Sequence, residues 1–378
     1  MQTPAHTSWL SAFLSFLALV ILAPALSAQQ PSAPTLQSDA RLVLVPFHVE
    51  RGKYFAADLQ PSDLILREDG HPRPFTTFEG PNTDHPLPLE LILLFDTSPK
   101  VTPKDFSPLS FWHWDPKADY EFLDNWDESD TSAILQRSGM DIRVAVYHYS
   151  GSQLEKLCNA TSDPKEIVRA FHSLLEPIPP GKGELTLFPG EKIVKPQFGG
   201  RPLALTSNAV FAAMKDEDAS SAPARRVLIV FTVGIDGTSS NPLSATDDKI
   251  ASSALASNIA IDPVIVDEYK THMAGTAPGA GGEISTVDTS AGTIYDGPLP
   301  QFANIGEETG GKVFVPPYLN RQALAAILGL ARDTMLSEYV VGFSPDAALT
   351  PKKHSLAVKL SAKSKGKLIG GEKNGVMY

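Results

Sequence analysis

The chain has 378 residues, with 32 Lys and Arg against 43 Asp and Glu, which gives a formal net charge of −11 at pH 7. This acidic balance argues against a nucleic-acid-binding protein, because contacts to phosphates need a basic face. Hydrophobic residues make up 42% of the chain, which excludes disorder along its whole length. The single cysteine, Cys158, excludes an intrachain disulfide and a four-cysteine zinc site.

An apolar segment without charges lies at residues 9–26 and is followed by small residues. Residues 1–28 together are typical of a signal peptide, although the segment before the apolar stretch contains no Lys or Arg. The alternative is an uncleaved membrane anchor, since the apolar stretch lies at the lower limit for crossing a bilayer. Pro24 and the small residues favour cleavage, so we expect an exported protein, periplasmic or secreted, without a stable membrane span after cleavage.

The N-terminal part of the mature chain has the pattern of short strands. Residues 29–40 are polar and contain prolines, which predicts a flexible linker. Between residues 41 and 80, segments rich in β-branched and aromatic residues alternate with turn residues such as Asp69 and Gly70. Three short strands are marginal alone, so this unit needs a partner sheet.

The middle of the chain, residues 86–335, predicts an α/β domain. Its near-continuous apolar runs are typical of parallel strands buried on both faces, and amphipathic helical patterns lie between them. The runs lie at 89–95, 141–149, 225–233 and 258–266. The alternation predicts a doubly wound, mostly parallel sheet with flanking helices. We expect an insertion at 101–130 and a mobile surface loop at 269–300, which is rich in Gly, Ser and Thr.

The C-terminal residues 336–378 return to a strand pattern. We infer that they pair with residues 41–80 to form a small β-sandwich-like domain, into which the α/β domain is inserted. The Lys-rich tail from Lys352 to Lys373 alternates charge with Leu and Val. This pattern predicts the solvated face of terminal strands, which also protects a sheet edge from aggregation.

Five strings follow one another in an order that resembles a known family. They are DLQPSDLILREDGHPRPFTTFEG at 58–80, LPLELILLFDTS at 87–98, RRVLIVFTVGIDGTSS at 225–240, EETGGKVFVP at 307–316 and SEYVVGFSP at 337–345. In combination they resemble the VWFA-related family of exported, acidobacterial-type bacterial proteins, over nearly the whole mature chain. The resemblance implies a von Willebrand factor A fold with a metal-ion-dependent adhesion site at the carboxyl ends of its parallel strands.

The family's adhesion site needs an Asp-x-Ser-x-Ser loop after the first strand of the sheet. Its carboxylate and hydroxyl oxygens suit a hard cation such as Mg²⁺. In this chain Asp96 and Ser98 match the first two ligand positions, but Lys100 occupies the third. The ammonium group of Lys100 would repel a cation placed there.

The other two loops of the family's site also depart from its pattern. Val233 stands where the third loop has its Asp, and Asp236 lies three residues further on. In the second loop Arg201 aligns with the ligand Thr, although Thr206 could serve in a shifted register. We therefore expect a degenerate site, no bound Mg²⁺ and no other cofactor, and binding of a protein partner without metal.

The predicted insertion contains an acidic, Trp-rich segment at residues 106–130, with Trp112, Trp114 and Trp126. Exposed Trp side chains would form an interaction surface near Lys100, at the end of the sheet where open α/β folds bind ligands. The alternative is that the aromatic side chains pack on the domain while the acids face water.

The sequence contains no recognisable catalytic motif: it has no HExxH, no G-x-S-x-G and no phosphate-binding loop. We therefore predict no catalytic residues and an exported, non-enzymatic protein-interaction or scaffold protein with a partner in the cell envelope. The residues predicted to bind that partner are Lys100, Trp112, Trp114, Trp126 and Asp236. The alternative function is an exported glycan-binding protein or hydrolase that uses residues 106–130.

Overall fold

A computed structural model describes most of the chain after residue 41, in segments. The segments are 42–52, 54–84, 86–98, 116–136, 140–189, 205–218, 224–232, 245–265, 285–286, 304–306, 308–316, 318–345 and 352–377. The predicted signal peptide 1–28 and linker 29–40 lie outside the described residues, as does nearly all of the predicted loop 269–300. In the described part of the chain, no helix combines the length and the apolar character that a membrane crossing needs.

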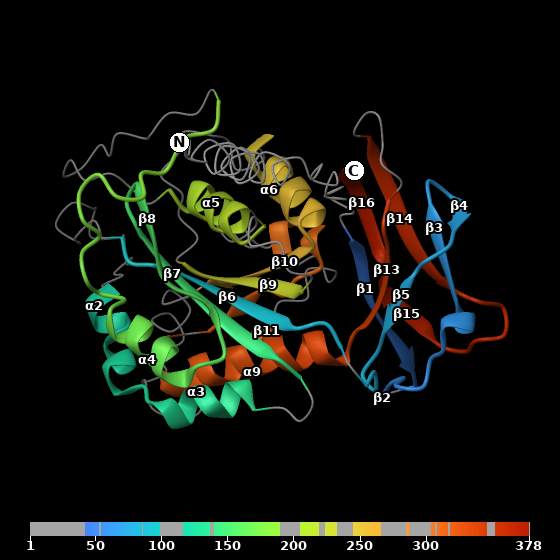
Figure 1. The fold of residues 1–378 in the computed structure, drawn as a ribbon, viewed down its shortest axis with the longest axis horizontal. Helices are drawn as coiled ribbons and strands as arrows, with labels where there is room; N and C mark the ends of the chain where they lie inside the picture. The colour runs from blue at the N-terminus through green and yellow to red at the C-terminus, as the bar shows by residue number, and fades with distance from the viewer. Residues whose placement is uncertain are drawn as a thin grey trace, which may run out of the picture. The chain divides into compact units, whose positions relative to one another are not determined.

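The central sheet has seven strands in the order β11-β12-β10-β9-β6-β7-β8 (Figure 1). The strands from β12 to β7 pair in parallel, while β8 and β11 pair antiparallel at the edges. Their bounds are β6 Leu89–Asp96, β7 Ile142–Ser150, β8 Gln153–Thr161, β9 Arg225–Thr232, β10 Ile259–Ile265, β11 Ser285–Thr286 and β12 Phe314–Val315. The strand β8 was not predicted from the sequence, since polar residues interrupt its apolar ones and nearly all of its residues are only half-buried.

Helices cover both faces of this sheet because the inner strands are apolar on both. In β6, Leu91, Leu93 and Phe95 face one core, while Ile92 and Leu94 face the other. The first core is covered by η3 Glu121–Asn125, α3 Glu128–Leu135, α4 Pro164–His172 and α9 Arg321–Ser337. The second core is covered by α5 Thr206–Asp218 and α6 Ala245–Ala256, which lie on the opposite side of the sheet in Figure 1. A short helix, α2 Pro116–Asp119, precedes η3.

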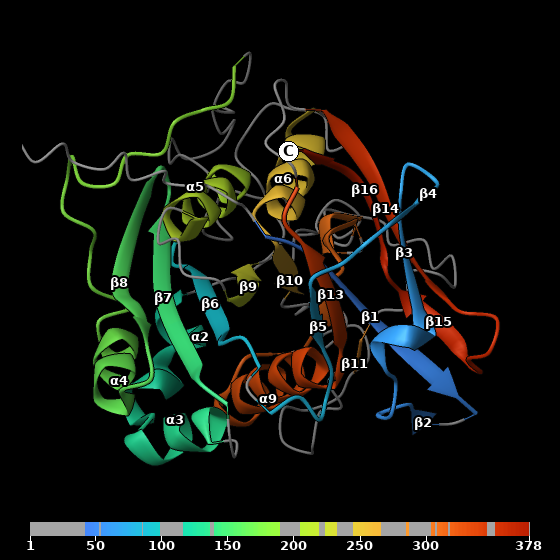
Figure 2. The ribbon, with the colours of Figure 1, turned by 45° about the vertical axis from the view of Figure 1, so that its right-hand side comes forward.

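Strands from both ends of the described chain form two antiparallel sheets (Figure 2). The five-stranded sheet has β15-β1-β13-β5, with β2 paired to β1, and the four-stranded sheet has β16-β14-β3-β4. Their bounds are β1 Val43–Arg51, β2 Tyr54–Phe55, β3 Leu64–Glu68, β4 His71–Arg73, β5 Thr77–Glu79, β13 Tyr339–Phe343, β14 Lys353–Leu360, β15 Lys367–Gly370 and β16 Glu372–Met377, with the 3-10 turn η1 at Pro61–Asp63. Side chains from both sheets fill one core between them, including Phe47, Leu66 and Leu356.

The predicted fold class is therefore confirmed: a mostly parallel sheet lies between helices, and N- and C-terminal strands pair in antiparallel sheets. The chain builds β7 and β8 on one side of β6, and then β9, β10 and β12 on the other. The strand order thus reverses between β6 and β9. In open α/β sheets, ligands bind outside the carboxyl ends of the strands at such a switch point.

Candidate functional site

A row of buried polar side chains crosses the carboxyl ends of β7, β6 and β9. Asp96 ends β6 and pairs with Tyr149 of β7, and Thr232 follows Phe231, which pairs with Phe95. Because parallel neighbours in register point to the same face, Tyr149, Asp96 and Thr232 lie side by side. Asp96, Tyr149 and Thr232 are buried.

Helix α5 begins against this row and adds a further hydroxyl group. Its first residue, Thr206, is fully buried, and its Oγ1 accepts a hydrogen bond of 3.0 Å from the phenol of Tyr149. The sequence had left Thr206 as an alternative to Arg201, and the described structure brings Thr206 to the cluster, whereas Arg201 lies outside the described residues.

The loop after β6 folds back on its own carboxylate. The Ser98 backbone N–H donates to Asp96 Oδ1 at 2.9 Å, and the Ser98 hydroxyl accepts a hydrogen bond of 3.1 Å from the backbone N–H of Gly151. The residues Asp96 and Ser98 are only 2% and 7% exposed. The two predicted ligand residues therefore lie together, but both are buried and bonded to the backbone.

Two phenols lie close to the Asp96 carboxylate. Tyr120 is fully buried and packs edge-on against Phe95, with ring centroids 5.5 Å apart. Burial raises the pKa of Tyr120 and of Tyr149 well above the ordinary value, and the negative charge of Asp96 raises both further. Both phenols are therefore protonated at neutral pH.

The donors at this site are hard oxygen atoms, as Mg²⁺ prefers, and in the described structure they bond to protein groups. Mg²⁺ demands a near-octahedral shell and keeps several waters. Here Thr206 Oγ1 is bonded to the Tyr149 phenol, and the Asp96 and Ser98 side chains are closed off from solvent. Among the described residues, the oxygen atoms that could bind a metal are therefore already engaged with other protein groups.

Most residues predicted to bind a partner cannot be placed. Lys100, Trp112, Trp114 and Asp236 lie outside the described residues, as does Val233, the replaced ligand position.

Trp126 is described, and its predicted role at the surface is wrong. It is 1% exposed and packs edge-on against Phe171, with ring centroids 5.6 Å apart. Its indole N–H donates to Thr131 Oγ1 at 2.9 Å. An apolar ring with its only donor satisfied is more stable in the core than in water, so the alternative of packed aromatic side chains holds for this Trp.

Tyr120, Tyr149 and Thr232 also belong to this site, although they were not predicted from the sequence. Aligning the ends of the apolar runs would have placed Tyr149 beside Asp96, since parallel strands end at one edge. Tyr120 lies in the predicted insertion and has no such signal.

The prediction for the end of the Lys-rich tail is also wrong, since Lys373 is 7% exposed. Strand β16 turns this side chain inward toward the start of β9, which the alternating pattern of the tail does not reveal.

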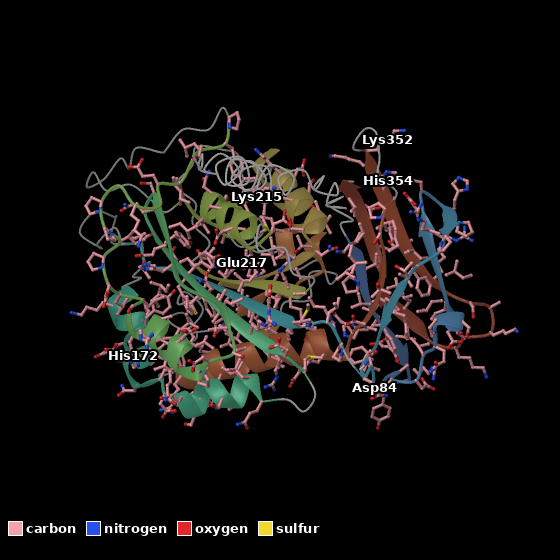
Figure 3. The ribbon with its side chains drawn as sticks, in the orientation of Figure 1. Asp84, His172, Lys215, Glu217, Lys352 and His354 are labelled. Atoms are coloured by element: carbon pink, nitrogen blue, oxygen red, sulfur yellow. The ribbon has the colours of Figure 1, made fainter. Side chains whose placement is uncertain are left out.

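The described residues include one group with metal-ligand chemistry, formed by Glu68, Asp69 and His354. His354 lies at the start of β14 (Figure 3), and its Nδ1 is 2.9 Å from Asp69 Oδ2 and 3.1 Å from Glu68 Oε1. Arg73 already pairs with the other oxygen of Glu68 at 3.3 Å. The group is therefore accounted for as a charge cluster that holds the β3–β4 hairpin against β14.

The lone cysteine and a buried histidine also have structural roles. Burial raises the pKa of Cys158 to about 11, so its thiol is protonated and a poor nucleophile. Burial lowers the pKa of His148, whose ring lies 3.4 Å from Glu155.

No protein-family model matches the chain, and no curated protein matches its sequence. Solved structures that are similar include the VWA domain of SpRpn10, with 13% identity and a TM-score of 0.30, covering 63% of this chain and 93% of that one. The ArnB paralog VWA2 from Sulfolobus acidocaldarius has 8% identity and a TM-score of 0.33, covering 83% of this chain and 74% of that one. The pilus adhesin SpaC from Lactobacillus rhamnosus GG has 7% identity and a TM-score of 0.37, covering 86% of this chain and 49% of that one. At such TM-scores the likenesses support no functional conclusion, and the fold assignment rests on strand order and helix placement.

Proposed function

We propose that this chain is an exported, non-enzymatic protein-interaction protein with a von Willebrand A-like domain of the VWFA-related type. The observation that carries the proposal is the position of the Asp96 cluster at the switch point between β6 and β9. Ligands bind at this end of open α/β sheets. The partner is a protein of the cell envelope, engaged by the loops that follow β6 and β9.

Metal independence is part of this proposal. Asp96 and Ser98 are bonded to backbone N–H groups, and the Tyr149 phenol donates to the threonine that would complete a ligand set. In the sequence, Lys100 and Val233 replace two further ligands. The cluster thus supports the shape of the loop in the way that a bound ion does in an intact adhesion site.

The site of partner binding is tested by photo-crosslinking in the native host. A photoreactive amino acid replaces Lys100, two residues beyond Ser98, and the matched control replaces Asp333 on α9, whose side chain is 54% exposed. We expect one envelope protein to be captured from position 100 and not from position 333. Equal capture from both positions, or none from position 100, contradicts the proposal.

Metal independence is tested on the purified chain with the partner identified by crosslinking. We expect the Kd for this partner to change less than about twofold between Mg²⁺ and EDTA. We also expect calorimetry of the wild type to detect no Mg²⁺ binding of the kind that Asp96→Ala would abolish. A loss of affinity of about tenfold in EDTA would show that a metal bridges the two proteins.

Export is tested separately by removing residues 1–28. We expect the full chain in the periplasm or the medium and the shortened chain in the cytoplasm, by fractionation and immunoblotting. Equal distribution of the two forms contradicts a role of this segment in export.

A further inference from the structure

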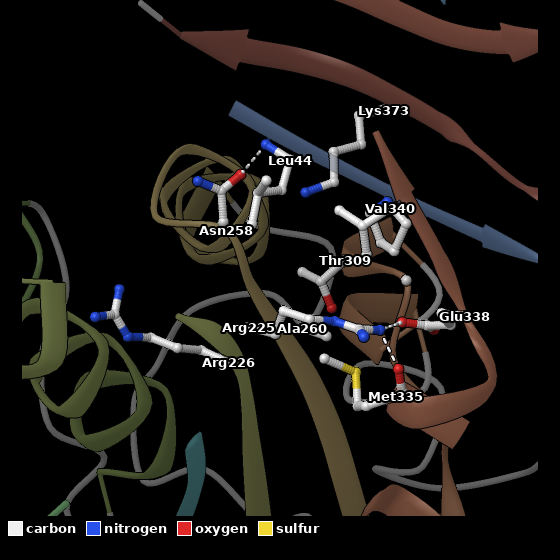
Figure 4. A pocket seen from close by; sticks show the side chains of 12 residues that line it. Leu44, Arg225, Arg226, Asn258, Ala260, Thr309, Met335, Glu338, Val340 and Lys373 are labelled. Carbon is white, nitrogen blue, oxygen red and sulfur yellow. Dashed lines mark hydrogen bonds and ion pairs between the residues drawn. The ribbon is translucent and has the colours of Figure 1, made fainter. Parts of the chain in front are cut away.

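A pocket lies where the α/β sheet meets the N- and C-terminal strands, at the end of the sheet opposite to Asp96. Its walls come from the start of β9, the turn before β10, the end of α9, and strands β1, β13 and β16. Its enclosed part has room for only about 30 Å³, and the rest of the pocket is open to solvent. Figure 4 shows the side chains that line it.

The Lys373 amine points into this pocket, and none of the described residues forms an ion pair with it (Figure 4). The residue is 7% exposed, and no described residue forms an ion pair or hydrogen bond with its side chain. Burial lowers the pKa of Lys373 to about 8, and only the charge of Glu338 raises it. The amine is therefore still mostly protonated at neutral pH, and a buried ammonium group without an acceptor destabilises the fold.

The other charged side chains of the pocket are already paired, so none of them neutralises the positive charge of Lys373. Arg225 pairs with Glu338 at 3.2 Å and also donates to the Met335 carbonyl, while Arg226 pairs with Glu90 at 2.7 Å. The Nε of Arg225 is buried and has no hydrogen-bond partner among the described residues. Burial raises the pKa of Glu338 to about 7, which reduces its negative charge near neutrality. The pocket therefore lacks one negative charge and offers a free donor.

The remaining walls are apolar, with Leu44, Met335 and Val340 among the lining residues. A ligand that suits such a pocket has one acidic group for the amine and a short apolar tail for these walls. Inorganic anions can pair with the amine, but they have no apolar group to cover the apolar walls.

We infer that this pocket binds a short-chain monocarboxylate, with its carboxylate on the Lys373 amine and its alkyl tail against Leu44, Met335 and Val340. This site is separate from the Asp96 cluster and does not depend on the proposed partner function.

The test measures butyrate binding to the purified chain by calorimetry, with ionic strength held constant by sodium chloride. We expect saturable binding to the wild type, a loss of at least about tenfold in affinity with Lys373→Met, and no change with Lys359→Met, an exposed lysine on β14. Butyramide, which has the same shape without the charge, should not bind, and inorganic phosphate should bind more weakly than butyrate. Because Met removes a buried charge while keeping the chain length, Lys373→Met should fold and melt at a higher temperature than the wild type in chloride alone.

A second measurement does not depend on any variant. Lysine side-chain NMR of the wild type should show the pKa of Lys373 rising when butyrate is added, because a bound carboxylate stabilises the ammonium form. The inference is overturned if butyrate does not bind, if Lys373→Met binds it within about twofold of the wild type, or if phosphate binds as tightly as butyrate. A blocked peptide with one Asp side chain then tests whether the carboxylate comes from a protein or from a free acid. If the peptide binds as tightly as butyrate, the ligand is a protein carboxylate. If it binds more weakly, the ligand is a free acid.

Discussion

The side chain of Trp126 shows how burial decides the role of a residue that its sequence context left open. The sequence left an exposed ring and a packed ring as alternatives, and the indole lies between η3 and α3, where Thr131 accepts the hydrogen bond of its N–H. The nearby acidic residues stabilise helix ends. Asp127 caps α3 by accepting bonds from the backbone N–H groups of Ser129 and Asp130. The acids thus serve the helix ends while the aromatic ring fills the core.

Replacement of Trp126 by Ala should therefore reduce stability and not partner binding. We expect a loss of about 3–5 kcal/mol in the free energy of unfolding, because a large cavity opens beside Phe171 and Thr131 loses its donor. Urea unfolding followed by circular dichroism measures this. Trp126→Phe is the control and should lose less, since it keeps the ring. A loss below about 1 kcal/mol for Trp126→Ala would mean that the ring is not buried in solution.

The buried carboxyl group of Glu338 should make stability depend on pH. Its pKa is raised from 4.5 to about 7 by burial, against the opposing charge of Arg225. Between these values the folded protein keeps a proton that the unfolded chain releases, so Glu338 favours folding at low pH and loses this contribution as pH rises toward 7. The shift corresponds to roughly 3 kcal/mol.

The measurement is the difference in free energy of unfolding between the wild type and Glu338→Gln from pH 4.5 to 8. Gln keeps the shape and an acceptor for Arg225 but does not titrate. We expect the wild type to lose stability relative to the variant as pH rises. The lowered pKa of His48, about 4, acts in the opposite direction below pH 6.5, but it is present in both proteins and cancels. A difference that is constant with pH contradicts the assignment.

Sequence patterns identified single residues of the site only where they belong to a motif. Asp96 and Ser98 follow an apolar strand and could be predicted. Tyr149 could have been placed beside Asp96 by aligning strand ends, whereas Lys373 could not be predicted, because its environment comes from strands that are distant in the chain. Alternation assigns a residue to one of two faces of a strand, and the tertiary contacts decide whether that face meets water or another layer.

Among the elements, strands that are buried on both faces were predicted well because their apolar runs are continuous. The edge strand β8 was not, since each of its residues is only half-buried or exposed and no apolar run marks it. The helices α3 to α6 and α9 could be predicted from their caps and amphipathic spacing. An example is α4, where Asp163 accepts from the Lys165 N–H and Pro164 takes the first position.

The turn between α6 and β10 fixes the position of β1 through one residue. Asn258 has a left-handed backbone, with φ of 55°. Its side chain accepts from the Leu44 N–H at 2.9 Å and donates to the Leu42 carbonyl at 2.6 Å. The end of one helix in the α/β domain is thereby tied to the central strand of the five-stranded sheet.

Substitutions of Asn258 should separate the contribution of its left-handed backbone from that of its side-chain hydrogen bonds. Asn258→Gly keeps the left-handed backbone and loses both hydrogen bonds, so we expect a loss of about 2 kcal/mol in unfolding free energy. Asn258→Ala also forces a Cβ into the left-handed region, which adds about 1 kcal/mol. Urea unfolding of both variants measures this order. If Ala proves as stable as Gly, the backbone at this position is not left-handed in solution.

At the scale of the whole molecule, the sequence predicted correctly that strands from the two ends pair. The reason is physical: three short N-terminal strands have too little apolar surface to stand alone. The sequence did not reveal that side chains of the α/β domain contribute to the core between the paired strands. Leu255 of α6 packs in that core, and Arg225 of β9 pairs with Glu338 next to β13.

These links predict that residues 41–378 unfold in one transition, although they contain two kinds of sheet. Hydrogen exchange measured across a urea series should give the same midpoint for peptides from β1 and from β6. Leu255→Ala removes a side chain that α6 contributes to the other core, and should cost about 2–5 kcal/mol. Because the layers are coupled, this substitution should lower both midpoints together. If the β1 peptide alone opens at lower urea, the paired strands fold independently and the Asn258 and Arg225 links carry little energy.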